Sequence, residues 1–203
     1  MSKTILVTGS SGFIGFNLSK LLMDNGNNVI GVDSYNNAYD PNFKRLRQKV
    51  LNSKNNFKEF ELNLDTKENL ESLEKENIDI VFHLAARAGV RQSFLDPISY
   101  IKDNSIATTN IANFVKDMNI KTLVLASTSS IYGDSGQEEM VEGVNEKIEP
   151  PSIYAASKLS GEVFAKNILE GTESNVVITR FFTVYGPFGR PDMSVLRFIH
   201  WVV

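Results

Sequence analysis

The stretch "VTGSSGFIG", residues 7–15, decides the fold of this chain. It joins a short β-branched run to an amphipathic stretch, so it predicts a strand, a tight turn and a helix in direct succession. A phosphate-binding turn of this kind requires glycine at three positions. Gly9 makes the turn, Gly12 lets the backbone approach a pyrophosphate, and Gly15 lets the helix pack closely on the strand. The start of that helix would offer N–H groups and a partial positive charge to an anion.

An acidic residue follows at the spacing that dinucleotide sites use. Asp33 ends the next β-branched run, "NVIGVD" at 28–33. A carboxylate there can accept hydrogen bonds from an adenosine ribose, and it would repel a ribose 2′-phosphate. The sequence therefore favours NAD over NADP as the cofactor. The alternative is that the glycines serve only a turn and its packing.

Apolar β-branched runs alternate with amphipathic stretches along the whole chain. We expect six strands with helical crossovers, including helices near 97–118 and 152–170 and a polar surface loop at 133–151. Such alternation predicts an α/β fold, a Rossmann-like doubly wound parallel sheet with helices on both faces, in a single domain over 1–203.

Local signals place two of the helices. In the second, "DPNFKRLRQKVLN", Asp40 is the expected N-cap and Pro41 the first helical residue. The first should stop at Gly26, and its apolar side is expected to consist of Phe13, Leu18, Leu21 and Leu22.

Composition excludes several classes of function. The 203 residues carry a net charge of −3 with no long run of like charges, so neither nucleic acid nor an anionic membrane is indicated as a partner. The chain has no cysteine and only two distant histidines, so disulfides, thiolate chemistry and a metal site are not expected. No apolar stretch is long enough to span a membrane, and a cytoplasmic protein is expected.

A tyrosine and a lysine stand four residues apart in "SIYAASK", residues 152–158. On a helix, Tyr154 and Lys158 would point the same way. A free tyrosine has a pKa of about 10, and a nearby ammonium together with a positive nicotinamide ring would lower that pKa by stabilising the phenolate. The pair therefore indicates a site that takes up and releases a proton. A half-exposed tyrosine beside a solvated lysine is the alternative.

Five motifs together resemble a known family: "VTGSSGFIG", "HLAARAGVRQS" at 83–93, "LASTSSIYG" at 125–133, "YAASK" at 154–158 and "RFFTVYGPFGRPDM" at 180–193. Along nearly its whole length the chain is similar to the extended short-chain dehydrogenases/reductases of the nucleotide-sugar branch. The motifs resemble most closely those of UDP-glucuronate 4-epimerases.

The resemblance implies NAD as cofactor, a UDP-sugar as substrate and an isomerase activity. Tyr154 would be the base, Lys158 its partner, and Thr128 a hydroxyl that relays the proton. Related dehydratases carry an Asp-Glu pair after this threonine and decarboxylases a glutamate, whereas this chain has Ser129 and Ser130. That difference favours simple oxidation and re-reduction at C4 of UDP-glucuronate through a 4-keto intermediate. The alternative is that Thr128 and its neighbouring serines only cap a turn.

The resemblance also assigns binding residues. Asn63 stands where relatives usually have an aspartate that contacts adenine, and an amide oxygen can still accept a hydrogen bond there. Arg190 and, less directly, Arg91 would meet a hexuronate carboxylate, because a guanidinium suits that anion well. The remaining sugar contacts would be Thr183, Ser129 and Ser130. Cofactor contacts would be Gly9, Gly12, Phe13, Ile14, Gly15, Asp33, Asn63, Leu64, Leu84, Ala85, Ala86, Asn104 and Lys158.

Relatives continue beyond the length of this chain into a smaller domain, so the resemblance implies that the substrate-binding C-terminal domain is largely missing. It also implies a homodimer through the helices near 97–118 and 152–170. Three hypotheses remain open: a working UDP-glucuronate 4-epimerase, a truncated NAD-binding remnant without turnover, and an epimerase or dehydratase for another sugar nucleotide. His83, on a buried strand, is expected to be a satisfied core histidine.

Overall fold

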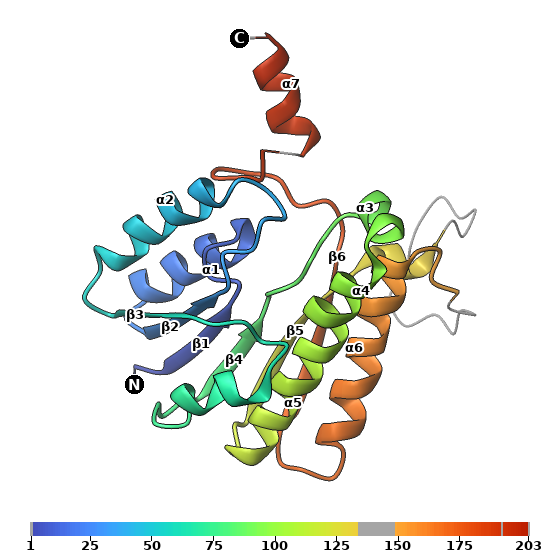
Figure 1. The fold of residues 1–203 in the computed structure, drawn as a ribbon. Coiled ribbons are helices and arrows are strands. Elements are labelled where there is room, and N and C mark those ends of the chain that lie inside the picture. The colour runs from blue at the N-terminus through green and yellow to red at the C-terminus, as the bar shows by residue number, and fades with distance from the viewer. Residues whose placement is uncertain (1, 134–148, 192, 203) are drawn as a thin grey trace.

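The fold is an α/β sandwich around one six-stranded parallel sheet, seen in a computed structural model that describes residues 2–133, 149–191 and 193–202 (Figure 1). The strand order is β3-β2-β1-β4-β5-β6, which confirms the predicted doubly wound topology. The strands are β1 (Thr4–Thr8), β2 (Asn28–Asp33), β3 (Phe57–Glu61), β4 (Ile80–His83), β5 (Thr122–Thr128) and β6 (Asn175–Phe181).

Helical segments connect successive strands. They are α1 (Phe13–Asp24), α2 (Pro41–Asn52), the 3₁₀ turn η1 (Lys67–Leu73), α3 (Val90–Leu95), α4 (Pro97–Tyr100), the π-helical η2 (Ile101–Ile106), α5 (Ala107–Asp117), the 3₁₀ turn η3 (Ser129–Tyr132), α6 (Ile153–Leu169) and α7 (Ser194–Val202). The helix predicted near 97–118 is thus a series of α4, η2 and α5. In Figure 1, α7 projects away from the rest of the fold.

The sheet has an apolar core on each face. On one face, α1 and α2 contribute Phe16, Met23 and Leu51, which pack against alternate residues of β1 and β2. On the other face, η1, α5 and α6 pack on the opposite side chains of the same sheet; this cluster includes Leu70, Ile111, Val115, Ala165 and Leu169. Two covered faces explain why the strands read as near-continuous apolar runs.

Two local predictions about helices fared differently. The Asp40 carboxylate accepts the Asn42 N–H at 2.9 Å, and Pro41 begins α2, as predicted. The expected apolar side of α1 was right in part: Phe13 is buried and Leu22 packs against the core, but Leu21 is 59 % exposed while Phe16 and Met23 are buried. The sheet lies against the face that carries Phe16, which the leucine pattern did not single out. The predicted loop at 133–151 falls mostly on 134–148, outside the described residues.

Strand order reverses between β1 and β4, which pair in parallel from Ile5–Ile80 to Thr8–His83. The chain leaves β1 toward β2 and leaves β4 toward β5, so the loops at the carboxyl ends of β1 and β4 diverge. Ligands of open α/β sheets bind at such a switch point. Among the described residues, no helix is both long and apolar enough to cross a bilayer.

Candidate active site

A cavity of about 510 Å³ lies at the carboxyl ends of the strands. Its size is within the usual range for sites of small molecules and cofactors. Most of the residues predicted for a site line it: Gly9, Gly12, Phe13, Ile14, Gly15, Asp33, Asn63, Leu64, Leu84, Ala85, Ala86, Thr128, Ser129, Ser130, Tyr154, Lys158, Thr183 and Arg190. The cavity therefore joins the glycine turn to the tyrosine–lysine helix.

The glycine turn leaves no room for side chains. Gly9 has φ +70°, and a Cβ placed on it would lie 2.8 Å from the Ala85 backbone nitrogen. A Cβ on Gly15 would lie 2.1 Å from the Gly9 carbonyl oxygen, so α1 starts in direct contact with the turn. Gly12 is the N-cap of α1, and no side chain caps that end. The first N–H groups of α1 therefore remain available to a ligand in the cavity.

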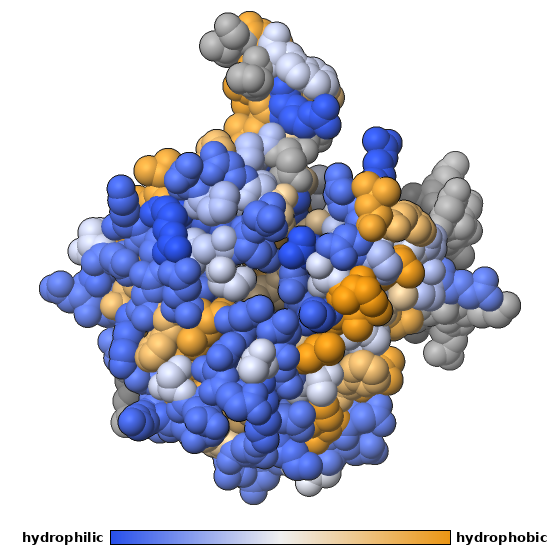
Figure 2. All heavy atoms as spheres, viewed as in Figure 1, coloured by the Kyte–Doolittle hydropathy of each residue, from blue (hydrophilic) through white to orange (hydrophobic). Residues whose placement is uncertain are grey.

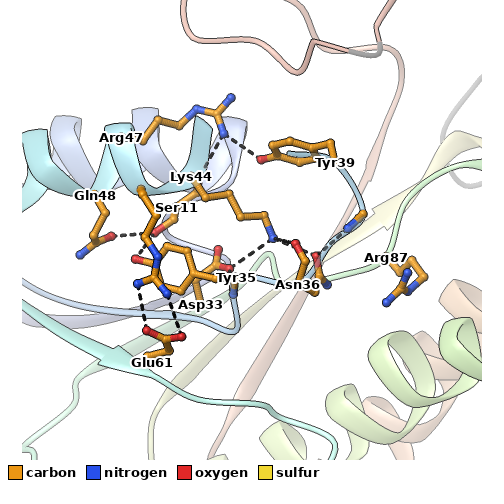
Figure 3. Close-up of polar contacts among 12 residues, drawn as sticks. Ser11, Asp33, Tyr35, Asn36, Tyr39, Lys44, Arg47, Gln48, Glu61 and Arg87 are labelled. Carbon is orange, nitrogen blue, oxygen red and sulfur yellow. Dashed lines mark hydrogen bonds and ion pairs between the residues drawn. The ribbon is translucent and has the colours of Figure 1, made fainter. Parts of the chain in front are cut away.

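Asp33, at the end of β2, is 7 % exposed and faces the cavity. Its carboxylate accepts the Tyr35 N–H at 2.9 Å, and the Lys44 ammonium lies 3.5 Å from the same oxygen. Lys44 also donates to the Asn36 side-chain oxygen at 2.9 Å (Figure 3). Burial lowers the pKa of Lys44, which the Asp33 charge opposes. This end of the cavity is thus a paired carboxylate and ammonium.

Tyr154 and Lys158 both face the cavity from the first turns of α6, which Ser152 caps by accepting the Ala155 N–H at 3.1 Å. The Tyr154 ring packs edge-on against Tyr100, with centroids 6.2 Å apart, and the Tyr100 hydroxyl donates to the Gly89 carbonyl. Lys158 is 4 % exposed and lines the cavity. Burial lowers the pKa of Lys158 to about 8.

A buried carboxylate anchors the helix next to this lysine. Glu162, one turn beyond Lys158, accepts hydrogen bonds from Arg180 on β6 at 3.0 and 2.7 Å and from the Ser127 hydroxyl on β5. The paired guanidinium and the Ser127 hydroxyl lower the pKa of Glu162 against the effect of burial. The charge of Glu162 also opposes the loss of the Lys158 proton. The network fixes the face of α6 that carries Tyr154 against the ends of β5 and β6.

Thr128, the last residue of β5, is 5 % exposed and lines the cavity. Its hydroxyl oxygen accepts the Ser130 N–H at 3.1 Å, so it caps the η3 turn. A hydroxyl that accepts one hydrogen bond keeps its proton for donation. The two interpretations of Thr128 are therefore compatible: its oxygen caps the turn, and its hydroxyl proton is free to be donated to a group in the cavity.

The loop after β6 closes one side of the cavity with Thr183 and Arg190. Arg47 of α2, 3 % exposed, holds this loop by donating to the carbonyls of Phe188 and Gly189 at 2.9 and 3.1 Å. The same guanidinium donates to the Ser11 carbonyl at 3.1 Å. One buried side chain therefore ties the loop that carries Arg190 to the glycine turn.

Two predicted site residues lie elsewhere. Arg91 is exposed on α3 and does not belong to the described lining of the cavity. Asn104, 1 % exposed, is also outside that lining: it accepts the Arg87 N–H at 2.7 Å and donates to the Ser157 hydroxyl at 2.9 Å. Asn104 thus connects the loop after β4 to the helix of Tyr154 from behind the cavity wall.

His83 ends β4 and is fully buried. Its Nδ1 lies 2.8 Å from the Thr8 hydroxyl oxygen and its Nε2 lies 3.1 Å from that of Thr108. The Thr8 oxygen accepts the Ala85 N–H, so it can donate its own proton to Nδ1 and leave Nε2 to donate to Thr108. Burial, with a smaller effect of Lys158, lowers the pKa of His83 to about 3. The expected satisfied core histidine is confirmed.

This burial predicts a pH dependence of stability. Between its ordinary pKa of 6.5 and about 3, His83 binds a proton in the unfolded chain but not in the folded one. The free energy of unfolding should therefore be complete above pH 6.5 and fall with decreasing pH, by up to about 1.4 kcal/mol per pH unit. Urea unfolding between about pH 7 and 5 measures the slope. His83→Gln should flatten it, and an equal slope in the variant would contradict the assignment.

Sequence reasoning missed several side chains of the candidate site, of which Lys44, Arg47 and Tyr39 are the clearest. All three lie at or beside the cavity: Lys44 and Tyr39 line it, and the Arg47 guanidinium donates to the Tyr39 hydroxyl at 2.8 Å. The available signal was the spacing of Lys44, Arg47, Gln48 and Leu51 along one side of α2. Those positions recur with helical period, but polar residues in such a stripe normally face water.

Comparison with known proteins agrees with this geometry. The model of the NAD dependent epimerase/dehydratase family matches residues 5–203. The chain is 42 % identical over 200 residues to an uncharacterized protein of Methanocaldococcus jannaschii, covering 97 % of this chain and 61 % of the relative. It is 41 % identical over 198 residues to the UDP-glucuronate 4-epimerase of Thermodesulfobacterium geofontis, with the same two coverages.

Among solved structures, the fold is similar to that of UDP-glucuronic acid 4-epimerase from Bacillus cereus, crystallised with UDP-glucuronic acid and NAD. The TM-score is 0.83 at 32 % identity, and the match covers 98 % of this chain and 62 % of that one. The chain thus spans about three fifths of the length of these relatives. Fold, site and family model lead to one conclusion: the chain belongs to the NAD dependent epimerase/dehydratase family.

Proposed function

We propose that the chain binds NAD in the cavity and inverts the configuration at C4 of a UDP-sugar, with UDP-glucuronate as the substrate. The observation that carries this proposal is the placement of Tyr154, Lys158 and Thr128 in one cavity with the glycine turn and Asp33. The names of the relatives point to the same reaction and cofactor. The proposed activity is an isomerisation, because the Ser129 and Ser130 positions hold no acid for eliminating water.

The residues present fit a dinucleotide. The uncapped start of α1 and its glycines suit a pyrophosphate, which needs N–H donors and close approach of the backbone. The Asp33 carboxylate suits ribose hydroxyls. The Lys158 ammonium, buried in the cavity wall, suits the hydroxyls of the second ribose. When bound, the nicotinamide supplies a reversible acceptor for the hydrogen on C4.

The side chains then divide the proton chemistry. The C4 hydroxyl gives its proton to the Tyr154 phenolate, and the Thr128 hydroxyl can relay that proton between the C4 oxygen and the phenolate. The Lys158 ammonium stabilises the phenolate, because opposite charges attract strongly in a partly dry site. Glu162 and Tyr100 hold Tyr154 and Lys158 in place. When C4 is reduced again, Tyr154 returns the proton to the C4 oxygen, and the face of C4 that is reduced decides which of the two epimers forms.

Arg190 is proposed to receive the substrate carboxylate. It lines the cavity on the loop after β6, which Arg47 fixes. A guanidinium can bind a carboxylate through two parallel hydrogen bonds, and a neutral hexose would lack that partner. This arrangement supports a hexuronate over a hexose as the sugar. Arg91, being exposed outside the cavity lining, is not included in the proposal.

The experiment is to incubate the purified chain with UDP-glucuronate and identify the products. We expect UDP-galacturonate as the product. Starting from UDP-glucuronate or from UDP-galacturonate should lead to the same equilibrium mixture of the two. Turnover of UDP-glucose but not of UDP-glucuronate would assign another sugar nucleotide to the site. Binding of NAD without turnover of either sugar would make the chain a binding module.

We also propose a homodimer through the helices near 97–118 and 152–170, with α3 beside them. Large apolar side chains are exposed there, and hydrophobic atoms gather over α3 and α4 in Figure 2. They include Phe94 (60 %), Leu95 (80 %), Ile98 (60 %), Val163 (47 %) and Phe164 (44 %). An apolar patch of this kind usually marks an interface.

Introducing charge into this patch should separate the protomers. In the double variant Leu95→Glu/Ile98→Glu, two carboxylates would have to be buried without partners, so we expect a monomer by sedimentation velocity. Leu21→Glu, at a 59 % exposed leucine of α1 on the other face of the sheet, is the matched control and should stay dimeric. A wild-type chain that sediments as a monomer at micromolar concentration would contradict the dimer.

A further inference from the structure

The adenosine end of the cavity holds a cation that the sequence did not indicate. Asp33 alone would repel a 2′-phosphate on the ribose. In the structure, the Lys44 ammonium lies 3.5 Å from the Asp33 carboxylate, and both residues line the cavity (Figure 3). The charge that a ribose meets is therefore that of a pair, not of a single carboxylate.

Lys44 is held in this position from three sides. It is 6 % exposed and donates to the side-chain oxygen of Asn36 at 2.9 Å and to its backbone carbonyl at 3.4 Å. Its ammonium also lies 5.4 Å from the centroid of the Tyr39 ring. The helix that carries it is fixed by Arg47, which donates to the Ser11 carbonyl of the glycine turn. The ammonium therefore cannot swing into bulk water without breaking these contacts.

Two other cations of the described residues in this region are already engaged. The Arg47 guanidinium is hydrogen-bonded to the Ser11, Phe188 and Gly189 carbonyls and to the Tyr39 hydroxyl. Arg87 is ion-paired with Asp103 at 2.8 Å. Lys44, with its ammonium 3.5 Å from the Asp33 carboxylate, is placed to act directly on a group bound at Asp33.

We propose that Lys44 is a second determinant of dinucleotide choice, so that the Asp33–Lys44 pair, and not Asp33 alone, sets the preference between an adenosine ribose with a free 2′-hydroxyl and one with a 2′-phosphate. The inference rests on the proposed dinucleotide site but not on the epimerase reaction. Lys44 weakens the exclusion of the 2′-phosphate that Asp33 exerts. Burial lowers the pKa of Lys44, and a phosphate dianion bound beside the ammonium would act in the opposite direction and favour the protonated form.

The test is the ratio of the NADP dissociation constant to the NAD dissociation constant, measured by calorimetry on the full chain at one salt concentration. Lys44→Met removes the charge and keeps most of the stem, and it should raise the ratio by about tenfold or more. Lys44→Arg keeps the charge and should leave the ratio near that of the wild type. Lys49→Met, at an exposed lysine on the same helix, is the matched control for charge at a distance and should change nothing.

A double-mutant cycle separates the two members of the pair. Asp33→Asn should lower the ratio strongly, because the Lys44 ammonium is then unopposed and attracts the 2′-phosphate. In Asp33→Asn/Lys44→Met, much of that gain should disappear, which would show that the preference depends on the pair. Thermal unfolding of each variant identifies any that fail to fold. If Lys44→Met fails to fold, the ratio in Asp33→Asn/Lys44→Arg tests the charge instead, and it should stay as low as in Asp33→Asn.

The outcomes are distinguishable. A ratio in Lys44→Met within about twofold of the wild type would overturn the proposal, and this includes the case in which both dinucleotides lose affinity equally. Either result would leave the proposed epimerase function standing, since NAD would still bind to the wild type. A wild-type chain that binds neither dinucleotide would overturn both this inference and the proposed function.

Discussion

Tyr154→Phe should lower the turnover of UDP-glucuronate by about 10²–10⁴-fold, the usual contribution of a positioned acid–base group. The substitution removes only the phenolic oxygen. The ring remains, so its edge contact with Tyr100, at 6.2 Å between centroids, and the packing of α6 are retained. We therefore expect unchanged NAD affinity and an unchanged thermal midpoint. The loss would then lie in the chemical step and not in folding or cofactor binding.

A second tyrosine provides the control. Tyr185, in the loop after β6, is 76 % exposed and does not belong to the described lining of the cavity. Tyr185→Phe makes the same chemical change outside the site and should retain full turnover. Product formation from UDP-glucuronate at saturating NAD is the measurement. If Tyr154→Phe keeps the activity of the wild type, the base has been assigned to the wrong residue.

Gly15→Ala should destabilise the fold by about 3 kcal/mol or more and abolish NAD binding. A Cβ on Gly15 would lie 2.1 Å from the Gly9 carbonyl oxygen and 2.7 Å from the Gly9 carbonyl carbon. Both contacts are to backbone, so no side chain can rotate away. Relief requires α1 to move from the turn, which displaces the N–H groups proposed to receive the pyrophosphate.

Gly26→Ala is the matched control for this glycine, because it lies just beyond the other end of α1. Its φ is +79°, but no heavy atom of the described residues lies within 4 Å of an added Cβ. The cost should be only the left-handed strain of a non-glycine residue, about 1–2 kcal/mol. Urea unfolding of the two variants compares the values. Equal destabilisation by both would contradict the close contact between Gly15 and the turn.

Local sequence signals were sufficient for the sheet and for the glycine turn. The apolar runs predicted the strands because both faces of a parallel sheet are buried, and "VTGSSGFIG" predicted its turn because the geometry depends on adjacent residues. Tyr154 and Lys158 were found for a similar reason, since helical spacing places positions four apart on one side. The roles of Thr183 and Arg190 came from the resemblance alone.

Helix α2 shows why the rest could not be predicted. Its apolar residues Phe43, Leu46 and Val50 are 43, 59 and 42 % exposed, while Lys44 and Arg47 are 6 and 3 % exposed. This is the reverse of the orientation that a hydrophobic pattern implies. The polar side is buried because its partners are backbone carbonyls and a carboxylate around the cavity. Those partners are distant in sequence, Phe188 being 141 residues from Arg47. No local pattern contains that information.

The central claim is that the cavity at the carboxyl ends of the strands is an NAD site in which Lys158 takes part. Calorimetric titration of NAD into the purified chain, freed of any copurified nucleotide, tests it most directly. We predict saturable binding of one NAD per chain, weakened by about tenfold or more in Lys158→Met, because an ammonium–hydroxyl hydrogen bond is lost. Absence of saturable binding to the wild type, or equal affinity in the two proteins, would contradict the claim.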